Sequence, residues 1–249
     1  MDLQAQEGFL TTSVRVLVAT AVPVERDAVA RAFAGPGDQV ALPGATLHRI
    51  GALDLVAVGV GPALAAATTA SVLTAAALRG TPYDLVVSAG IAGGFAPHAP
   101  VGSLVVADDI VAADLGAETP DGFVPVTELG FGTVNHRPPQ SLVQDLAAAI
   151  GAPTGAVLTV STVTGSAARA AELRARHPHA LAEAMEGFGV AEAAAAHGTP
   201  VVEIRAVSNP VGPRDRAAWR IGDALSALTA GFGKLAPVLE SWKRHDRTQ

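Results

Sequence analysis

The amino-acid sequence predicts an α/β protein in which helices cover both faces of a mostly parallel sheet. Short runs of β-branched and apolar residues alternate with helical stretches, an order typical of parallel sheets with helical crossovers. These runs are apolar almost throughout, as in strands that are buried on both faces. No internal repeat or linker divides the 249 residues. We therefore expect one domain over 1–249, with flexible ends at 1–13 and 243–249.

The first half of the chain begins with a valine-rich strand, VRVLVAT at 14–20, which leads into a helix at about 23–34. Two apolar runs at 45–50 and 53–60 are separated by a short connection and predict a hairpin. The second of these runs feeds an alanine-rich helix at 62–79. This half therefore predicts a strand–helix unit, a hairpin and a second helix.

The second half continues the alternation of strands and helices. A strand at 84–90 ends in the glycine-rich IAGGF, and a long strand follows at 102–114. The least regular stretch, 114–140, is long for a loop in a compact domain, which indicates a lid or an interface. The remaining predicted elements are strands at 156–162, 180–186 and 200–209, and helices at 166–176, 187–197 and 222–242.

The composition excludes several classes of site. The chain has no cysteine, so disulfides, thiolate metal ligands and a cysteine nucleophile are excluded. The motif HPH at 177–179 lacks a matching cluster of acids and histidines, so we expect no metal. The sequence also gives no reason to expect a cofactor.

The charge and the apolar segments bear on partners and location. A net charge of −6 is unfavourable for a nucleic-acid surface, which needs clustered lysine and arginine. The N-terminus lacks the basic start of a signal peptide, and the longest apolar stretch, 63–78, is too short to span a bilayer. We therefore expect a cytoplasmic protein that binds neither nucleic acid nor membranes.

Two glycine-rich stretches follow predicted strands. GVGPALAAA at 59–67 lacks the third glycine of the dinucleotide-binding fingerprint, and the next strand ends without an acidic residue, so a nicotinamide site is disfavoured. SAGIAGGF at 88–95 is consistent with a backbone that approaches a ligand closely and equally with a tight turn. We expect no arginine beside this second stretch, so it does not indicate phosphate binding.

Polar residues stand at three ends of predicted elements. Glu25 lies in the first turn of its helix, where an acid either interacts favourably with the helix dipole or belongs to a functional site. Met185 and Glu186 stand at a strand–helix junction, either as a core methionine and a solvated glutamate or as a platform for a sugar diol. Asn209 ends a strand where α/β enzymes place their chemistry, although an amide cannot act as an acid.

These segments, in this order, resemble the purine nucleoside phosphorylase and nucleosidase superfamily over roughly 14–240. The motifs that carry the resemblance are the helix-start glutamate, AGIAGGF, AMEG and RAVSN. The chain is most similar to the methylthioadenosine/adenosylhomocysteine nucleosidase branch and, within it, to nucleosidases that cleave futalosine. The resemblance implies a three-layer αβα sandwich with a mixed, mostly parallel sheet. It also implies a homo-oligomeric N-glycosidic-bond hydrolase that releases hypoxanthine from futalosine in menaquinone biosynthesis.

The same resemblance implies roles for individual residues. Glu25 matches the carboxylate that deprotonates the attacking water, and Glu186 matches the acceptor of the ribose 2′- and 3′-hydroxyls. Asn209 stands where nucleosidases of adenine substrates carry an aspartate that protonates purine N7. The other matched substrate-binding positions are Ile91, Ala92, Gly93, Val163 and Met185.

The amide of Asn209 favours a 6-oxopurine substrate. The departing 6-oxopurine spreads its negative charge onto O6, where the amide N–H can donate, while the amide carbonyl accepts the N7–H. Futalosine is a hypoxanthine nucleoside with a carboxyphenyl ketone at its 5′ end, so it needs a roomy pocket. We expect the 114–140 loop to supply that pocket through Phe123, Phe131, His136 and Arg137, with Arg137 facing the carboxylate. Asp215 stays open as an alternative acid.

Two other functions stay open from the sequence. A phosphate-dependent phosphorylase is one, because Arg26 could contact an anion, although Ser88 stands where phosphorylases carry an arginine. A nucleoside-binding protein without turnover is the other. The presence of both Glu25 and Glu186 disfavours it, because two anionic groups near one sugar suit an oxocarbenium-like transition state.

Overall fold

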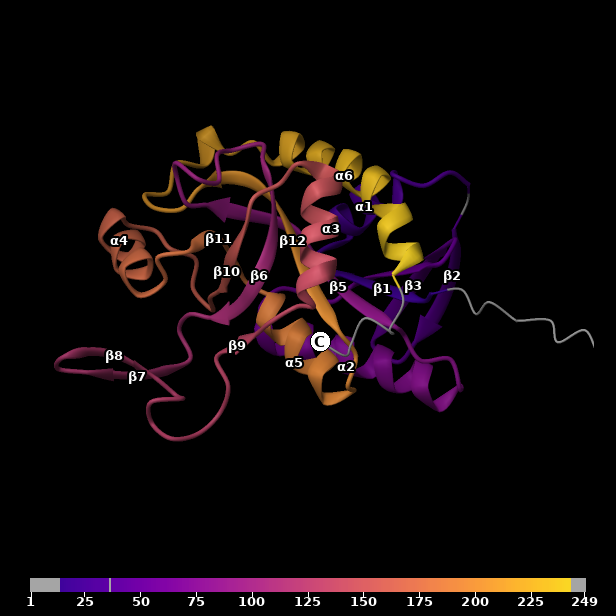
Figure 1. The fold of residues 1–249 in the computed structure, drawn as a ribbon, viewed down its shortest axis with the longest axis horizontal. Coiled ribbons are helices and arrows are strands. Elements are labelled where there is room, and N and C mark those ends of the chain that lie inside the picture. The colour runs from indigo at the N-terminus through magenta and orange to yellow at the C-terminus, as the bar shows by residue number, and fades with distance from the viewer. Residues whose placement is uncertain (1–13, 36, 243–249) are drawn as a thin grey trace, which may run out of the picture.

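A ten-stranded sheet forms the middle layer of the protein, whose residues 14–35 and 37–242 are described by a computed structural model (Figure 1). The ends predicted to be flexible, 1–13 and 243–249, lie outside the described residues. The strand order is β11-β10-β6-β12-β5-β1-β4-β3-β2, with β9 paired to β6. The strands of the sheet are β1 (Val16–Thr20), β2 (Asp38–Leu42), β3 (Ala45–Ile50), β4 (Leu53–Ala57), β5 (Leu85–Gly94), β6 (Leu104–Ala112), β9 (Asn135–His136), β10 (Thr154–Thr159), β11 (Ala180–Ala184) and β12 (Val201–Pro210).

The direction of the strands divides the sheet into two parallel blocks. Strands β4, β1, β5 and β12 are parallel neighbours, and so are β6, β10 and β11. The blocks meet where β12 pairs antiparallel to β6, and the antiparallel strands β3 and β2 extend one edge. The predicted mixed, mostly parallel sheet and the 45–60 hairpin are therefore confirmed.

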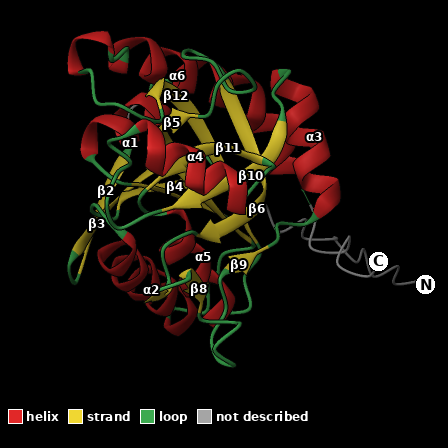
Figure 2. Ribbon diagram, turned by 90° about the vertical axis from the view of Figure 1, so that its left-hand side faces the viewer, coloured by secondary structure: helices red, strands yellow, loops and turns green. Residues whose placement is uncertain are grey.

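Helices cover both faces of this sheet, so the predicted three-layer sandwich is confirmed. Figure 2 shows α2 (Pro62–Leu78) and α5 (Gly187–Ala196) below the sheet, and α1 (Pro23–Ala30) and α6 (Ile221–Ser241) above it. Helix α3 (Gln140–Ile150) packs in the layer of α1 and α6, while α4 (Ala167–Arg176) covers β10. No described helix is both long and apolar enough to cross a membrane.

The two cores explain why the strands are apolar throughout. In β1, Leu17 and Ala19 pack into the core shared with α2 and α5, whereas Val16 and Val18 pack into the core shared with α1, α3 and α6. Alternate residues of a strand point to opposite faces, so a strand covered on both faces needs apolar residues at every position. Burial of these side chains stabilises the sandwich by about 25 cal/mol per Å² of apolar surface removed from water.

The structure differs from the predicted elements in three places. The glycine-rich end of the 84–90 strand is not a loop, because β5 stays paired to β12 as far as Gly94, with one shift of register between Val207 and Asn209. The patterns did not predict β2 or α3. Finally, the 114–140 stretch contains a hairpin of β7 (Gly116–Thr119) and β8 (Gly122–Pro125), which projects at the left of Figure 1.

The extended end of β5 gathers the strands that carry the predicted site. Gly93 is paired with Asn209 of β12 on one side and with Glu183 of β11 on the other, the second pairing being antiparallel. The sheet therefore curls back on itself here. Residues distant in sequence meet at this end of β5, next to the start of α1.

Candidate active site

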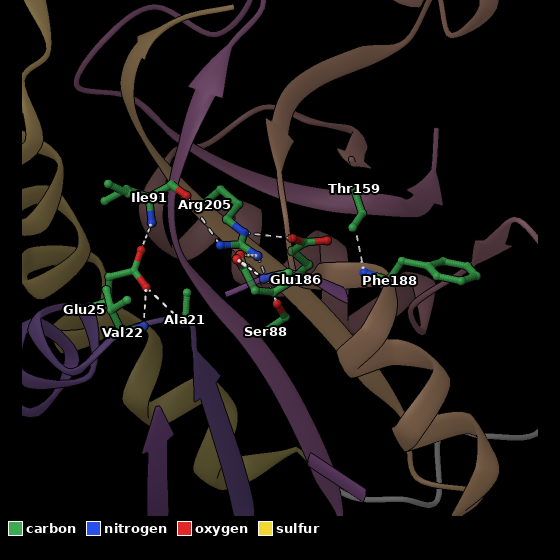
Figure 3. Close-up of polar contacts among 11 residues, drawn as sticks. Ala21, Val22, Glu25, Ser88, Ile91, Thr159, Glu186, Phe188 and Arg205 are labelled. Atoms are coloured by element: carbon green, nitrogen blue, oxygen red, sulfur yellow. Dashed lines mark hydrogen bonds and ion pairs between the residues drawn. The ribbon is translucent and has the colours of Figure 1, made fainter. Parts of the chain in front are cut away.

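Glu25, at the start of α1, is held by backbone groups of the β1–α1 connection and of β5. Its Oε2 atom accepts hydrogen bonds from the N–H groups of Ala21 and Val22 at 3.0 and 3.3 Å, as an acid in the first helical turn commonly does. Its Oε1 atom accepts from the N–H of Ile91 in β5 at 2.8 Å (Figure 3). Helix capping and a site role are thus compatible. Burial raises the pKa of Glu25, and the positive charge of Arg205 opposes this effect.

The guanidinium of Arg205 lies at the centre of the site, although the sequence did not single it out. Its Nε atom donates to Glu203 Oε1 at 2.8 Å. Its Nη2 atom lies 3.4 Å from Glu186 Oε2 and from Ser88 Oγ (Figure 3). Its Nη1 atom lies 3.4 Å from the carbonyl oxygen of Ile91. Burial alone would lower the pKa of Arg205, but the neighbouring carboxylates raise it.

This arrangement corrects the expectation that no arginine stands beside the glycine-rich stretch. Arg205 is paired with Gly90 across β12 and β5, and a Cβ atom at position 90 would lie 2.7 Å from both Arg205 Nη1 and Glu25 Oε1. Gly90 does not have a positive φ angle. Its lack of a side chain is therefore required by close approach and not by a turn.

Glu186 and Met185 connect β11 to α5. Glu186 is buried, its Oε1 atom accepts from the N–H of Gly61 at 3.2 Å, and its Oε2 atom faces Arg205. A solvated glutamate is therefore excluded. Met185 is partly buried, so part of its side chain can contact a ligand.

Asn209 lies at the other side of the β5 end, with an amide that retains hydrogen-bonding capacity. Its Oδ1 atom accepts from Ser208 Oγ at 2.8 Å, and its Nδ2 atom donates to the carbonyl of Pro210 at 3.0 Å. A primary amide has two N–H groups and two lone pairs, so one of each is left for a nucleobase. The Nδ2 atom lies 3.4 Å from the position of a Cβ atom on Gly93.

The loop that carries Val163 is fastened to the same strands. The buried carboxylate of Glu183 accepts from the N–H of Thr164 at 2.8 Å and from its hydroxyl. Since Glu183 is paired with Gly93, this contact holds the exposed Val163 near the end of β5. Burial raises the pKa of Glu183, and the two hydrogen bonds from Thr164 oppose this effect.

The structure thus brings the predicted residues together at one end of β5, but the side chain of Ala92 does not face the site. Ala92 is buried in the core with α2 and α5, and its carbonyl accepts from Ser208 Oγ at 3.2 Å. Ile91 and Gly93 on either side of it are partly exposed. The alternation along a strand explains this difference.

Several residues named as alternatives have other partners. Asp215 is exposed and caps the short helix η1 (Arg216–Ala218), since its Oδ1 atom accepts from the N–H of Ala217 at 3.1 Å. The guanidinium of Arg26 pairs with Asp27 at 2.7 and 2.9 Å.

The residues named for the 5′ pocket have varied surroundings in the structure. Phe123 lies under the guanidinium of Arg176, 4.3 Å from ring centre to carbon. Arg137 lines a cavity with Asp108 and His179. Phe131 is 63% exposed. These contacts do not test whether Phe123 and Arg137 face the substrate, so that expectation stays a prediction.

The charges of the site suit a reaction centre that becomes positive. Among the described residues, the carboxylates of Glu25, Glu186 and Glu203 act on the single guanidinium of Arg205. Fixed negative charge in a buried site stabilises a cation that forms there more strongly than the same charge in water.

Comparisons with known proteins show which family the chain belongs to. Residues 44–234 match the model of the phosphorylase superfamily. The chain is 75% identical over 233 residues to futalosine hydrolase of Streptomyces coelicolor, with 93% of this chain and 99% of that protein covered. It is 45% identical over 230 residues to futalosine hydrolase of Acidothermus cellulolyticus, with 90% and 91% covered.

Solved structures show the same fold at lower sequence identity. The native structure of futalosine hydrolase from Helicobacter pylori superposes with a TM-score of 0.76 at 18% identity and covers 90% of this chain and 97% of its own. The superfamily match and the two closely similar relatives lead to one assignment. The chain belongs to the phosphorylase superfamily and, within it, to the futalosine hydrolases.

Proposed function

We propose that the protein hydrolyses the N-glycosidic bond of futalosine and releases hypoxanthine and dehypoxanthine futalosine, as a step of menaquinone biosynthesis. The observation that carries the proposal is the pair of buried carboxylates, Glu25 and Glu186, on either side of Arg205 at the end of β5. The 75% identity to a futalosine hydrolase over almost its whole length supports the same substrate.

The proposed reaction assigns a role to each end of the site. Glu25 takes a proton from a water molecule whose oxygen attacks ribose C1′. The bond from C1′ to purine N9 breaks, and its electrons leave with the base, which takes a proton at N7 from solvent. Glu186 accepts the 2′- and 3′-hydroxyls, Met185 packs on the ribose, and Asn209 donates to O6 of the departing base.

The surroundings of Arg205 favour water over phosphate as the nucleophile. Its guanidinium is fully buried and already donates to Glu203, so its charge is compensated by carboxylates. A phosphate dianion at the same place would face the negative charges of Glu25 and Glu186 at short range. A phosphorylase would instead need an unpaired cation there.

Exposed apolar side chains next to these carboxylates fit the 5′ substituent. Val24 precedes Glu25 and is 50% exposed, and Val60 precedes Gly61 and is 55% exposed. Gly61 donates to Glu186, so this surface adjoins the ribose end of the site. A carboxyphenyl ketone presents an aromatic ring that apolar surface of this kind can cover.

The proposal also includes a homo-oligomer in the cytoplasm. Exposed large apolar side chains on the 114–134 segment, Leu115, Leu129 and Phe131, support contact with a second copy of the chain. Light scattering of the purified protein should give a mass that is a multiple of 25.0 kDa. A mass of one chain at micromolar concentration would contradict this part of the proposal.

One assay tests the reaction and its alternatives together. The purified protein is incubated with futalosine, inosine and methylthioadenosine, each with and without phosphate, and the released base is measured by chromatography. We expect hypoxanthine from futalosine without phosphate. Strict dependence on phosphate, with ribose-1-phosphate from inosine, would identify a phosphorylase. Tight binding of hypoxanthine without any release would identify a binding protein.

A further inference from the structure

Glu203 is a buried carboxylate that the proposed reaction does not use. It lies on β12 two residues before Arg205 and is fully inaccessible to solvent. Its Oε1 atom accepts from Arg205 Nε at 2.8 Å, while its Oε2 atom is without a hydrogen-bond partner within the described part of the chain. A buried, half-satisfied carboxylate is costly, so its presence calls for a reason.

The start of α5 is built to admit this carboxylate. A Cβ atom on Gly187 would overlap both oxygens of Glu203, so a side chain at position 187 is excluded while Glu203 keeps its place. Gly187 directly follows Glu186, which faces the same guanidinium. The recess therefore places the Glu203 carboxylate behind Arg205 and next to the residue assigned to the ribose.

The distances around Arg205 rank its partners. The contact with Glu203 is a short charge-assisted hydrogen bond at 2.8 Å, whereas Nη2 lies 3.4 Å from Glu186 Oε2. Glu25 is held by backbone N–H groups of Ile91, Ala21 and Val22 and not by Arg205. The guanidinium is thus drawn most closely to Glu203, the one carboxylate of the three that the proposed reaction does not use.

We propose that Glu203 is a positioning residue that draws the charge of Arg205 away from Glu25 and Glu186, and so leaves these two carboxylates the negative charge that the reaction needs. The inference rests on the proposed nucleosidase function. Without Glu203, Arg205 would pair closely with the two remaining carboxylates. Glu25 would become a weaker base, and the site would offer less stabilisation to a cationic ribosyl group.

Glu203→Gln tests the proposal because it keeps the size of the side chain and removes its charge. The charged groups facing Glu25 are Arg205 from β12 and Glu186 at the start of α5, with Glu203 behind Arg205. Loss of the negative charge at 203 and closer approach of Arg205 both favour the ionised form of Glu25. The acid limb of kcat/KM for futalosine should therefore move down by about 1 pH unit. The value of kcat at pH 7 should fall by about tenfold or more.

Two further variants separate positioning from a loss of folding. Glu203→Asp keeps the charge, so we expect its acid limb to stay at the wild-type pH even if its rate falls. Asp54→Asn removes another buried carboxylate, which pairs with Arg15 at 2.9 Å at the other end of the sheet. It should lower the melting temperature and leave the acid limb unchanged.

The outcomes distinguish failure of this proposal from failure of the proposed function. Wild-type protein that releases no hypoxanthine from futalosine would contradict the function itself. Active wild-type protein together with a folded Glu203→Gln variant whose acid limb has not moved would overturn the role of Glu203. That role would also be overturned if Glu203→Asp and Asp54→Asn shifted the limb as far as Glu203→Gln does.

Discussion

The Glu25 carboxylate accepts hydrogen bonds from backbone N–H groups of the β1–α1 connection and of β5, so its position does not depend on a substrate. Glu25→Gln keeps the side chain's size but cannot take a proton from water. We expect kcat for futalosine to fall by about 10²- to 10⁴-fold while substrate binding stays within several-fold. Single-turnover kinetics and calorimetry measure the two quantities. Glu172→Gln, an exposed acid on α4, is the matched control, and a Glu25→Gln variant with wild-type kcat would remove Glu25 from the mechanism.

We expect the amide of Asn209 to determine which purine can leave. An aspartate at this position can protonate N7, which a 6-aminopurine needs more than a 6-oxopurine does. Asn209→Asp should raise the ratio of kcat/KM for the 6-amino analogue to that for futalosine by about tenfold or more. Asp215→Asn should leave the ratio unchanged, because Asp215 caps η1. An unchanged ratio in Asn209→Asp would refute our explanation of the amide.

Strand β5 can bring Glu25 and Arg205 together because it has no side chain at position 90. A Cβ atom there would lie 2.7 Å from an atom of each, in a part of the structure with little room to relax. Gly90→Ala should destabilise the fold by about 1–3 kcal/mol. It should also lower kcat by a larger factor than the factor by which it changes KM. In the control Gly233→Ala, on the exposed face of α6, no described atom lies within 4 Å of the new Cβ, so urea unfolding should show a gain of about 0.5–1 kcal/mol. Equal unfolding midpoints for the two variants would contradict the close-approach argument.

Elements covered on both faces were predictable from the sequence, because their apolar runs leave little alternative to a buried strand. The end of β5 was not, since consecutive glycines are also typical of a turn and only the partners β11 and β12 keep them extended. Helix α3 follows two prolines and begins without a side-chain cap, so it lacks the usual start signal. The hairpin β7–β8 lies in a stretch too irregular in pattern to predict.

The site was predictable to the extent that the resemblance covers it. Glu25, Glu186 and Asn209 stand in recognisable motifs, and the structure brings them to one end of β5. Arg205 stands in one of the same motifs, but nothing local indicates that it lies across from Gly90. The contact of Glu203 with Arg205 likewise depends on tertiary packing, because the absence of a side chain at Gly187 makes room for the Glu203 carboxylate. Contacts set by tertiary packing cannot be read from local patterns.

Burial of several carboxyl groups makes the stability of the whole molecule depend on pH. Burial raises the pKa of Glu25, Glu183 and Glu203, so between the ordinary carboxyl pKa and the raised one the folded state binds more protons than the unfolded state does. Stability contributed by such groups is complete below the unfolded pKa and declines as the pH rises toward the folded pKa. The function that needs these charges therefore works against the stability of the fold.

Glu183 allows this cost to be measured away from the reacting groups. Its pKa is raised above the ordinary value of 4.5, so between pH 4.5 and its folded pKa the folded state binds more protons than the unfolded state. The free energy of unfolding of wild-type protein, minus that of Glu183→Gln, should therefore decrease as the pH rises from 4.5 toward 7, because only the wild type titrates at this position. Urea unfolding at four or more pH values measures the difference. Glu172→Gln is the control of opposite sign, since a hydrogen bond from Arg169 lowers the pKa of Glu172 and its contribution should grow as the pH rises. A difference for Glu183→Gln that stays constant or increases with pH would show that the Thr164 hydrogen bonds outweigh burial at this carboxylate.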